Sequence, residues 1–217
     1  MFDEEKEELV NRLINCGYLR SKKVIDAFRK VPRHEFVHES LRNSAYTDQP
    51  LPVGYGQTIS APSMIAIMME SLDFRKNQRV LEIGTGSGYN AALIAEVVGK
   101  KGLVVTIERI KELAKRAEQT LADTGYENVR VLVGDGTCGY EDGAPWDRII
   151  VTACAPRIPQ PLVKQLADRG KIGVPVGEQY AMQTWTVGEK KSGELKISEH
   201  GGCSFVPLVG KYGWPEE

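Results

Sequence analysis

Residues 79 to 108 read R-V-L-E-I-G-T-G-S-G-Y-N-A-A-L-I-A-E-V-V-G-K-K-G-L-V-V-T-I-E and predict the centre of the fold. Val80, Leu81 and Ile83 form a short apolar run, which is the composition of a strand buried on both faces of a parallel sheet. Residues 90–98 carry an apolar face at helical spacing, and residues 103–107 form a second buried strand. Together these pieces predict a βαβ unit with a glycine turn at its first corner.

The glycine spacing distinguishes between two kinds of cofactor. A dinucleotide fingerprint, G-x-G-x-x-G, would place its third glycine at position 89, which is Tyr89; the sequence has Gly84, Gly86 and Gly88 instead. A dinucleotide needs a helix N-terminus free for its pyrophosphate, whereas an adenosyl sulfonium needs only room for the backbone to approach a ribose. Glu108 stands where a carboxylate can accept hydrogen bonds from that ribose. L-E-I-G-T-G-S-G resembles the first motif of S-adenosylmethionine-dependent methyltransferases, although a structural glycine turn in another α/β protein remains an alternative.

The rest of the chain continues this alternation of strands and helices. Helices about a dozen residues long between buried strands indicate a parallel sheet covered on both faces. Near the end the pattern changes to period-two alternation on both sides of a polar turn, which predicts a β-hairpin. We therefore expect an α/β fold: a doubly wound, Rossmann-like methyltransferase sheet, mostly parallel, with an antiparallel C-terminal hairpin and extra N-terminal helices.

We expect a single domain over residues 1–217. It would comprise N-terminal helices and a lid (1–60), a cofactor-binding core (61–178), and the hairpin with a substrate-lining segment (179–217). The strands and helices expected beyond Glu108 are a helix over 111–124, a strand over 129–133, a turn at 134–136, a strand over 146–152, a helix over 159–166, a strand over 171–176 and a hairpin of 183–187 with 195–198.

Composition limits the possible partners. The formal net charge of -1 and the pI near 6.4 provide no field for holding nucleic acid or an anionic membrane. No apolar run approaches the ~20 residues of a membrane span, and the acidic start of the chain is unlike a signal peptide. Cys16, Cys138, Cys154 and Cys203 lack the C-x-x-C spacing of a zinc knuckle. We expect a cytoplasmic monomer without nucleic-acid or membrane partners.

One motif points to a different chemistry. Residues 34–38, H-E-F-V-H, match H-E-x-x-H, which on a helix binds zinc in metalloproteases. Catalytic zinc needs a third ligand, which could come from His200 or from a carboxylate such as Glu70. In a metalloprotease, however, the predicted βαβ unit would have no function in the catalysis. We therefore interpret the motif as a surface helix and keep the protease as an alternative.

Residues 45–60, A-Y-T-D-Q-P-L-P-V-G-Y-G-Q-T-I-S, predict a long loop with little regular structure. Such a loop in a compact domain is usually a lid or a binding loop. It leads into a helix expected over residues 62–72. Ser60 and Ser63 stand at the start of that helix, where each could merely cap it.

Taken together, these segments resemble the protein-L-isoaspartate O-methyltransferase family. The resemblance rests on V-P-R-H-E-F-V, the 45–60 segment, V-L-E-I-G-T-G-S-G-Y-N-A-A, V-T-I-E-R, G-D-G, W-D-R-I-I-V-T-A and F-V-P-L, and Q-T-I-S is its most discriminating part. It implies a repair enzyme that methylates the free carboxylate of L-isoaspartyl residues in damaged proteins and peptides. The methyl ester then converts through a succinimide towards normal aspartate. The implied cofactor is S-adenosyl-L-methionine, with S-adenosyl-L-homocysteine as product and no metal.

The resemblance also implies roles for individual residues. Ser60 would be the catalytic residue at the reacting carboxylate, and His34 and His38 would be structural. Ser63 departs from relatives that carry His or an aromatic residue there, which leaves open the shape of this part of the pocket but not the chemistry. The implied cofactor-binding residues are Thr58, Ile59, Gly84, Thr85, Gly86, Ser87, Gly88, Asn90, Glu108, Arg109, and, at the adenine, Asp135 and Gly136; the substrate-lining residues are Ser60, Val206, Pro207 and Leu208.

Three alternatives remain at this point. One is a methyltransferase with the same cofactor and another substrate, in which the Q-T-I-S segment would have no assigned function. The others are the zinc metalloprotease and a nucleotide-binding module without catalytic activity.

Overall fold

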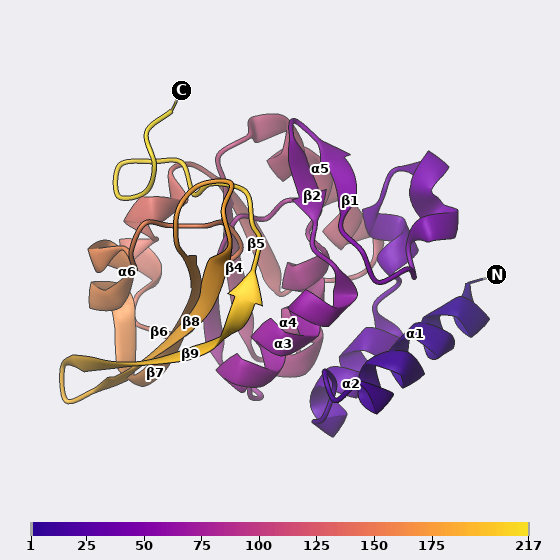
Figure 1. Ribbon diagram of the computed structural model, residues 1–217, viewed down its shortest axis with the longest axis horizontal. Helices are drawn as coiled ribbons and strands as arrows, with labels where there is room; N and C mark the ends of the chain where they lie inside the picture. Colours follow the sequence, from indigo (N-terminus) through magenta and orange to yellow (C-terminus); the bar gives the residue numbers. More distant parts are fainter. Residues whose placement is uncertain (1, 217) are drawn as a thin grey trace.

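The computed structural model describes residues 2–216 and has a seven-stranded sheet at its centre (Figure 1). The strand order is β5-β4-β3-β6-β7-β8-β9, in which the first five strands are parallel and the last two antiparallel. The strands are β3 (Arg79–Ile83), β4 (Leu103–Glu108), β5 (Val129–Val133), β6 (Trp146–Val151), β7 (Leu166–Val176), β8 (Gln183–Lys191) and β9 (Glu194–Cys203). The predicted fold class is confirmed.

Apolar layers cover both faces of the sheet. Successive residues of a strand point to opposite faces, so Val80 packs into one hydrophobic cluster and Leu81 into another. The first cluster lies under α3 (Pro62–Leu72), α4 (Tyr89–Val98) and α5 (Lys111–Asp123); the second lies under α6 (Gln160–Gln165) and the C-terminal segment. The sequence order of the strands reverses at β3, which lies between β4 and β6. Ligands of wound sheets bind at the carboxyl ends of strands at such a reversal.

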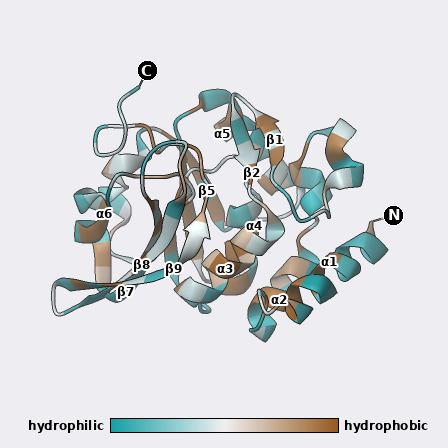
Figure 2. Cartoon of the chain, in the orientation of Figure 1, coloured by the Kyte–Doolittle hydropathy of each residue, from teal (hydrophilic) through white to brown (hydrophobic). Residues whose placement is uncertain are grey.

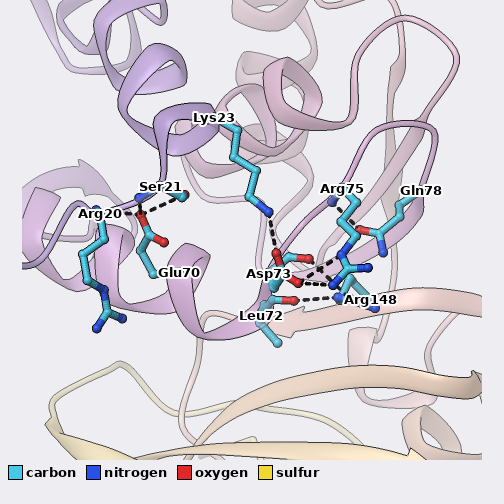
Figure 3. A network of polar contacts seen from close by, with 9 residues as sticks. All are labelled: Arg20, Ser21, Lys23, Glu70, Leu72, Asp73, Arg75, Gln78 and Arg148. Atoms are coloured by element: carbon cyan, nitrogen blue, oxygen red, sulfur yellow. Dashed lines mark hydrogen bonds and ion pairs between the residues drawn. The ribbon is translucent and has the colours of Figure 1, made fainter.

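Two N-terminal helices, α1 (Asp3–Asn15) and α2 (Lys22–Lys30), lie outside the sheet, and α2 packs against α4 (Figure 1). Figure 2 shows apolar and polar residues alternating along α1 and α2, whereas α3 is apolar over most of its length. Polar contacts also join this region to α3 (Figure 3). Glu70 accepts from the backbone N–H of Arg20 and from Ser21, and Lys23 pairs with Asp73. The N-terminal helices are thus attached independently of the cleft described below.

The predicted lack of regular structure over residues 45–60 is wrong in part. Residues 51–59 form a two-stranded antiparallel hairpin of β1 (Leu51–Gly54) and β2 (Gln57–Ile59). Its turn has positive φ at Tyr55 (55°) and Gly56 (69°). Pro52 is tolerated because a two-stranded ribbon leaves edge positions that need no N–H donor.

The structure also extends three predicted strands. β7 begins at Leu166 instead of residue 171, and the hairpin of β8 and β9 reaches residues 191 and 203. Among the helices of residues 2–216, none combines the length and apolar character that a membrane-spanning segment needs.

Candidate functional site

A cleft opens at the carboxyl ends of β3, β4 and β6, where the strand order reverses. Its empty space is about 800 Å³ when the open mouth is included, which is the range of small-molecule sites. Fourteen of the sixteen residues expected from the sequence line it: Thr58, Ile59, Ser60, Gly84, Thr85, Gly86, Ser87, Asn90, Glu108, Arg109, Gly136, Val206, Pro207 and Leu208.

The glycine turn after β3 forms the floor of this cleft. Gly84 has φ +94°, and a Cβ there would overlap with Oγ1 of Thr152. That hydroxyl lies 2.8 Å from the Gly84 carbonyl oxygen and donates to it. Gly86 has φ +53°, and a Cβ there would meet no protein atom within 4 Å. The turn therefore needs its glycines for backbone conformation and leaves its backbone open to a ligand.

Glu108 at the end of β4 holds the turn in this shape. Its side chain is nearly buried, with Oε2 3.0 Å from the N–H of Gly86 and Oε1 3.0 Å from the N–H of Ile110. A carboxylate offers about four acceptor sites, so two remain for hydroxyl donors. Glu108 can thus shape the turn and also accept hydrogen bonds from a ribose.

A second carboxylate, Glu82, lies entirely buried beneath the cleft. It accepts from Nδ2 of Asn90 and Oγ1 of Thr106, each at 2.7 Å, and Oγ1 of Thr106 lies 2.7 Å from Oγ1 of Thr85. Burial raises the pKa of Glu82 to about 7, against the lowering effect of the bonds from Thr106 and Asn90. The network fixes Asn90 and Thr85, which both line the cleft.

Asn90 offers the clearest test of whether the expected cofactor fits. Its Nδ2 donates to Glu82, which leaves Oδ1 as a buried acceptor without a partner among the described residues. Buried polar atoms are rarely left unsatisfied, so an acceptor on a cleft wall indicates a donor on the ligand. An amino-acid ammonium, as in S-adenosylmethionine, is such a donor. Oδ1 of Asn90 and the Glu108 carboxylate therefore suit the two polar ends of the cofactor.

Replacing Asn90 with alanine is expected to raise the dissociation constant for S-adenosylmethionine about 10-fold, because one hydrogen bond to a charged group is lost. Calorimetric titration measures this constant. Asn128→Ala is the matched control, since that amide donates to the carbonyls of Ala95 and Gly99 at the other end of α4. An Asn90 variant that binds as tightly as the control would contradict the assignment.

Ser60 lies on the cleft wall between β2 and α3. The N-cap of α3 is Ala61 and makes no side-chain cap, so neither Ser60 nor Ser63 serves as the cap. Instead Oδ1 of Asp48 accepts from the N–H of Ser63 at 2.8 Å. The alternative that these serines merely cap the helix is wrong.

Two expected residues lie outside the cleft lining. Gly88 is the N-cap of α4, and a Cβ there would contact Leu121, so it allows α4 and α5 to pack closely. Asp135 accepts from the backbone N–H of Thr137 at 2.9 Å and of Lys211 at 2.8 Å. Burial alone would raise the pKa of Asp135, but hydrogen bonds from Thr137 and the Lys211 N–H hold it below its ordinary value. Asp135 thus anchors the C-terminal segment beside the cleft.

The sequence did not single out several other residues that line the cleft. Thr152 and Ala153 follow β6; the rule that ligands gather at strand ends places the end of this strand on the binding rim but does not give these two residues a role. Gln57 belongs to the Q-T-I-S segment but was given no role of its own. The remaining residues lacked a signal that could have placed them in the cleft lining: Ile65, Met68, Ile83, Ile107 and Val209.

The H-E-x-x-H residues do not converge. The segment forms a short 3₁₀ helix, Arg33–Phe36, that ends before His38, so the expected surface helix is wrong. Nδ1 of His34 lies 2.8 Å from the Tyr46 hydroxyl, and Nδ1 of His38 lies 2.9 Å from Oγ of Ser40. Glu70 is bound to the Arg20–Ser21 backbone, and His200 contacts Ser198 on β9. Residues 2–216 contain no group of three or more His, Cys, Asp or Glu side chains placed to hold a metal.

Comparison with known proteins agrees with this geometry. Residues 4–213 match the family model described as protein-L-isoaspartate(D-aspartate) O-methyltransferase. A protein-L-isoaspartate O-methyltransferase of Methanopyrus kandleri is 54% identical over 100% of this chain and 96% of its own.

Solved structures give the same result. One protein-L-isoaspartate O-methyltransferase superposes with a TM-score of 0.88 at 33% identity, covering 96% of this chain and 67% of the other. A Plasmodium falciparum protein in complex with S-adenosyl-L-homocysteine has a TM-score of 0.83 at 26% identity, covering 93% and 97%. The chain belongs to the protein-L-isoaspartate(D-aspartate) O-methyltransferase family.

Proposed function

We propose that this chain transfers a methyl group from S-adenosyl-L-methionine to the free carboxylate of L-isoaspartyl residues in damaged proteins and peptides. The observation that carries the proposal is the composition of the cleft wall. The lining includes the glycine turn and Glu108, which suit the cofactor, together with Ser60 and the Val206–Leu208 segment, which suit the substrate. The methyl ester then closes spontaneously to a succinimide and reopens in part to normal aspartate.

The chemistry demands little of the protein's side chains. The nucleophile is the substrate's own carboxylate, which has a pKa near ~3.9 and is ionised at neutral pH, so no general base is needed. The bound cofactor supplies a methyl group on a sulfonium, which leaves as the neutral thioether. The protein has to hold the carboxylate oxygen in line with the methyl carbon and to exclude water, effects that together contribute up to ~7 to 11 kcal/mol.

Ser60 is the residue that we assign to orienting the substrate carboxylate. Charge is neutralised as the carboxylate meets the sulfonium, so a pocket that bound the anion very tightly would stabilise the ground state more than the transition state. A single neutral hydroxyl orients the carboxylate without this penalty.

Ser60→Ala is expected to lower kcat about 10-fold to 100-fold, ~1.4 to 2.7 kcal/mol, with little change in cofactor affinity. Steady-state kinetics and calorimetry with S-adenosylhomocysteine measure the two quantities. Ser63→Ala is the control, because Ser63 bonds to Asp48 through its backbone and lies outside the cleft lining. Equal losses in kcat and cofactor affinity would argue against this role for Ser60.

The Val206–Leu208 segment supports an extended peptide as substrate. The N–H of Cys154 donates to the Val206 carbonyl and the N–H of Leu208 donates to the Cys154 carbonyl, both at 2.7 Å. These bonds fix the segment's backbone beside the cleft. We propose that substrates bind mainly through backbone contacts of this kind and that the groove tolerates varied side chains. Sharp discrimination between peptides that differ only next to the damaged residue would contradict this.

One assay tests the whole proposal. Labelled methyl groups should pass from S-adenosylmethionine to a peptide with isoaspartate and not to the matched peptide with normal aspartate. Transfer to neither peptide, or to both equally, would overturn the proposed substrate. We also propose a monomer in the cytoplasm, as expected from the sequence; sedimentation of the purified chain tests the first point.

A further inference from the structure

Arg33 is completely buried and makes no salt bridge within residues 2–216. Nε donates to the Ala45 carbonyl at 2.8 Å, and Nη2 donates to the Ser60 carbonyl at 2.9 Å. The guanidinium lies 5.0 Å above the centre of the Tyr89 ring, and Nη1 has no partner among the described residues. One of the two hydrogen bonds that this buried cation donates therefore goes to the backbone of Ser60.

Fold stability alone is a weak reason for such an arginine. Burying a charge without a directly paired counter-ion is unfavourable, and burial lowers the pKa of Arg33 against the weaker opposing effects of Tyr89 and Asp48. An apolar side chain of similar volume often replaces a buried charge without loss of stability. The two carbonyl bonds need donors but not a charge, so stability alone does not explain why a cation stands here.

Arg33 is also not needed to attach the N-terminal helices. Val24, Ala27 and Phe28 of α2 are buried in the first hydrophobic cluster. Glu70 and Asp73 add polar contacts to Ser21 and Lys23, as Figure 3 shows. These contacts lie away from Ser60, so they would persist if Arg33 were replaced.

The position of Arg33 between two walls of the cleft suggests its role. Ser60 precedes α3 on the substrate side, and Tyr89 is the first residue of α4, directly after the glycine turn on the cofactor side. Arg33 bonds to the first and packs over the second. Asp48 also holds the start of α3, because it accepts a hydrogen bond from the Ser63 N–H.

We infer that Arg33 is a positioning residue that fixes the Ser60 hydroxyl relative to the glycine turn. The inference rests on the role proposed for Ser60. Displacements of about 1 Å in a reacting pair lower rates up to about 100-fold, so a bond to the Ser60 backbone is sufficient to matter. Cofactor affinity should depend little on Arg33, because Arg33 is not part of the cleft lining.

The test begins with Arg33→Met, which keeps the length and removes the donors. We expect kcat to fall about 10-fold to 30-fold, with the dissociation constant for S-adenosylhomocysteine within about twofold. The melting temperature should change little, because removal of a buried charge offsets the loss of a donor to the carbonyls of Ala45 and Ser60. Arg33→Lys keeps one donor and should recover part of kcat. Arg29→Met is the matched control and should keep full activity, because it only breaks an exposed ion pair between Arg29 of α2 and Glu7 of α1.

A double-mutant cycle with Ser60→Ala separates positioning from a general structural role. If Arg33 acts through Ser60, Arg33→Met should change kcat less than about threefold in the Ser60→Ala background. Equal fold losses in both backgrounds would overturn the inference while leaving the role of Ser60 intact. An unchanged kcat in Ser60→Ala alone would overturn the proposed role of Ser60, and this inference with it. The same cycle with Arg33→Lys serves if Arg33→Met does not fold.

Discussion

Replacing Glu108 with alanine is expected to weaken S-adenosylmethionine binding about 100-fold to 1000-fold, ~3 to 4 kcal/mol. Two effects add. The ribose loses a charged acceptor, and the N–H groups of Gly86 and Ile110 lose the oxygens that hold them at 3.0 Å. The glycine turn that forms the cleft floor would then no longer be fixed before the cofactor arrives. Calorimetric titration with S-adenosylhomocysteine measures the loss.

A graded series makes this prediction sharper. Glu108→Gln keeps one acceptor oxygen but turns an amide N–H₂ towards a backbone N–H, so an intermediate loss of about 10-fold is expected. Glu112→Ala is the control, because that carboxylate is exposed in the first turn of α5, one turn further along the chain. A Glu108→Ala variant within about threefold of the native affinity would remove Glu108 from the binding site.

The central sheet could be predicted because its signals are local. Each buried strand is a short apolar run, and the glycine spacing fixes the turn between β3 and α4. The long hairpin could not be delimited in this way. The period-two pattern covers only residues 183–187 and 195–198. Glu189, Lys191 and Glu199 also lie in β8 and β9, but most of β9 is exposed, so the pattern does not mark where these strands end. There the strands are defined by backbone pairing alone.

The residues of the site also divide into those with a local sequence signal and those placed by long-range contacts. Glu108 could be predicted because the βαβ unit fixes its distance from the glycine turn. The bond from Arg33 to Ser60 spans 27 residues, and the Glu82 network joins β3, β4 and α4. Contacts of this kind depend on tertiary packing and leave no spacing in the sequence to read. The β1–β2 hairpin was missed because Pro52 argues against a strand in the sequence. In the structure Pro52 lies in a two-stranded ribbon, where proline is tolerated at an edge position.

Glu82 gives the second large expected effect, on stability as a function of pH. Its pKa is about 7 in the folded protein against an ordinary value of 4.5, so between these values the folded state holds a proton that the unfolded state releases. Stability from this group is fully present below pH 4.5 and is lost as pH rises through 7. The contribution of Glu82 to the free energy of unfolding should therefore fall by roughly 3 kcal/mol across this window. His34, whose pKa is lowered by burial, acts in the opposite direction in this range, so the effect of Glu82 is read as a difference from a variant that keeps His34.

Glu82→Gln isolates this contribution, because its neutral amide resembles the protonated acid and its oxygen can still accept from Asn90. Urea unfolding at pH 5, 6, 7 and 8 gives the free energy of unfolding of each protein. The value for the native sequence should fall with pH relative to that for Glu82→Gln. Glu118→Gln, which replaces an exposed residue of α5, is the control and should follow the native curve. Asp73 and Asp135 have lowered pKa values, so their stabilisation is lost only at more acidic pH and does not overlap this window. Parallel native and Glu82→Gln curves would mean that Glu82 ionises without penalty in the fold. We expect the two free energies of unfolding to converge at pH 5 and to differ at pH 8, because Glu82 is a buried carboxylate without a cation beside it.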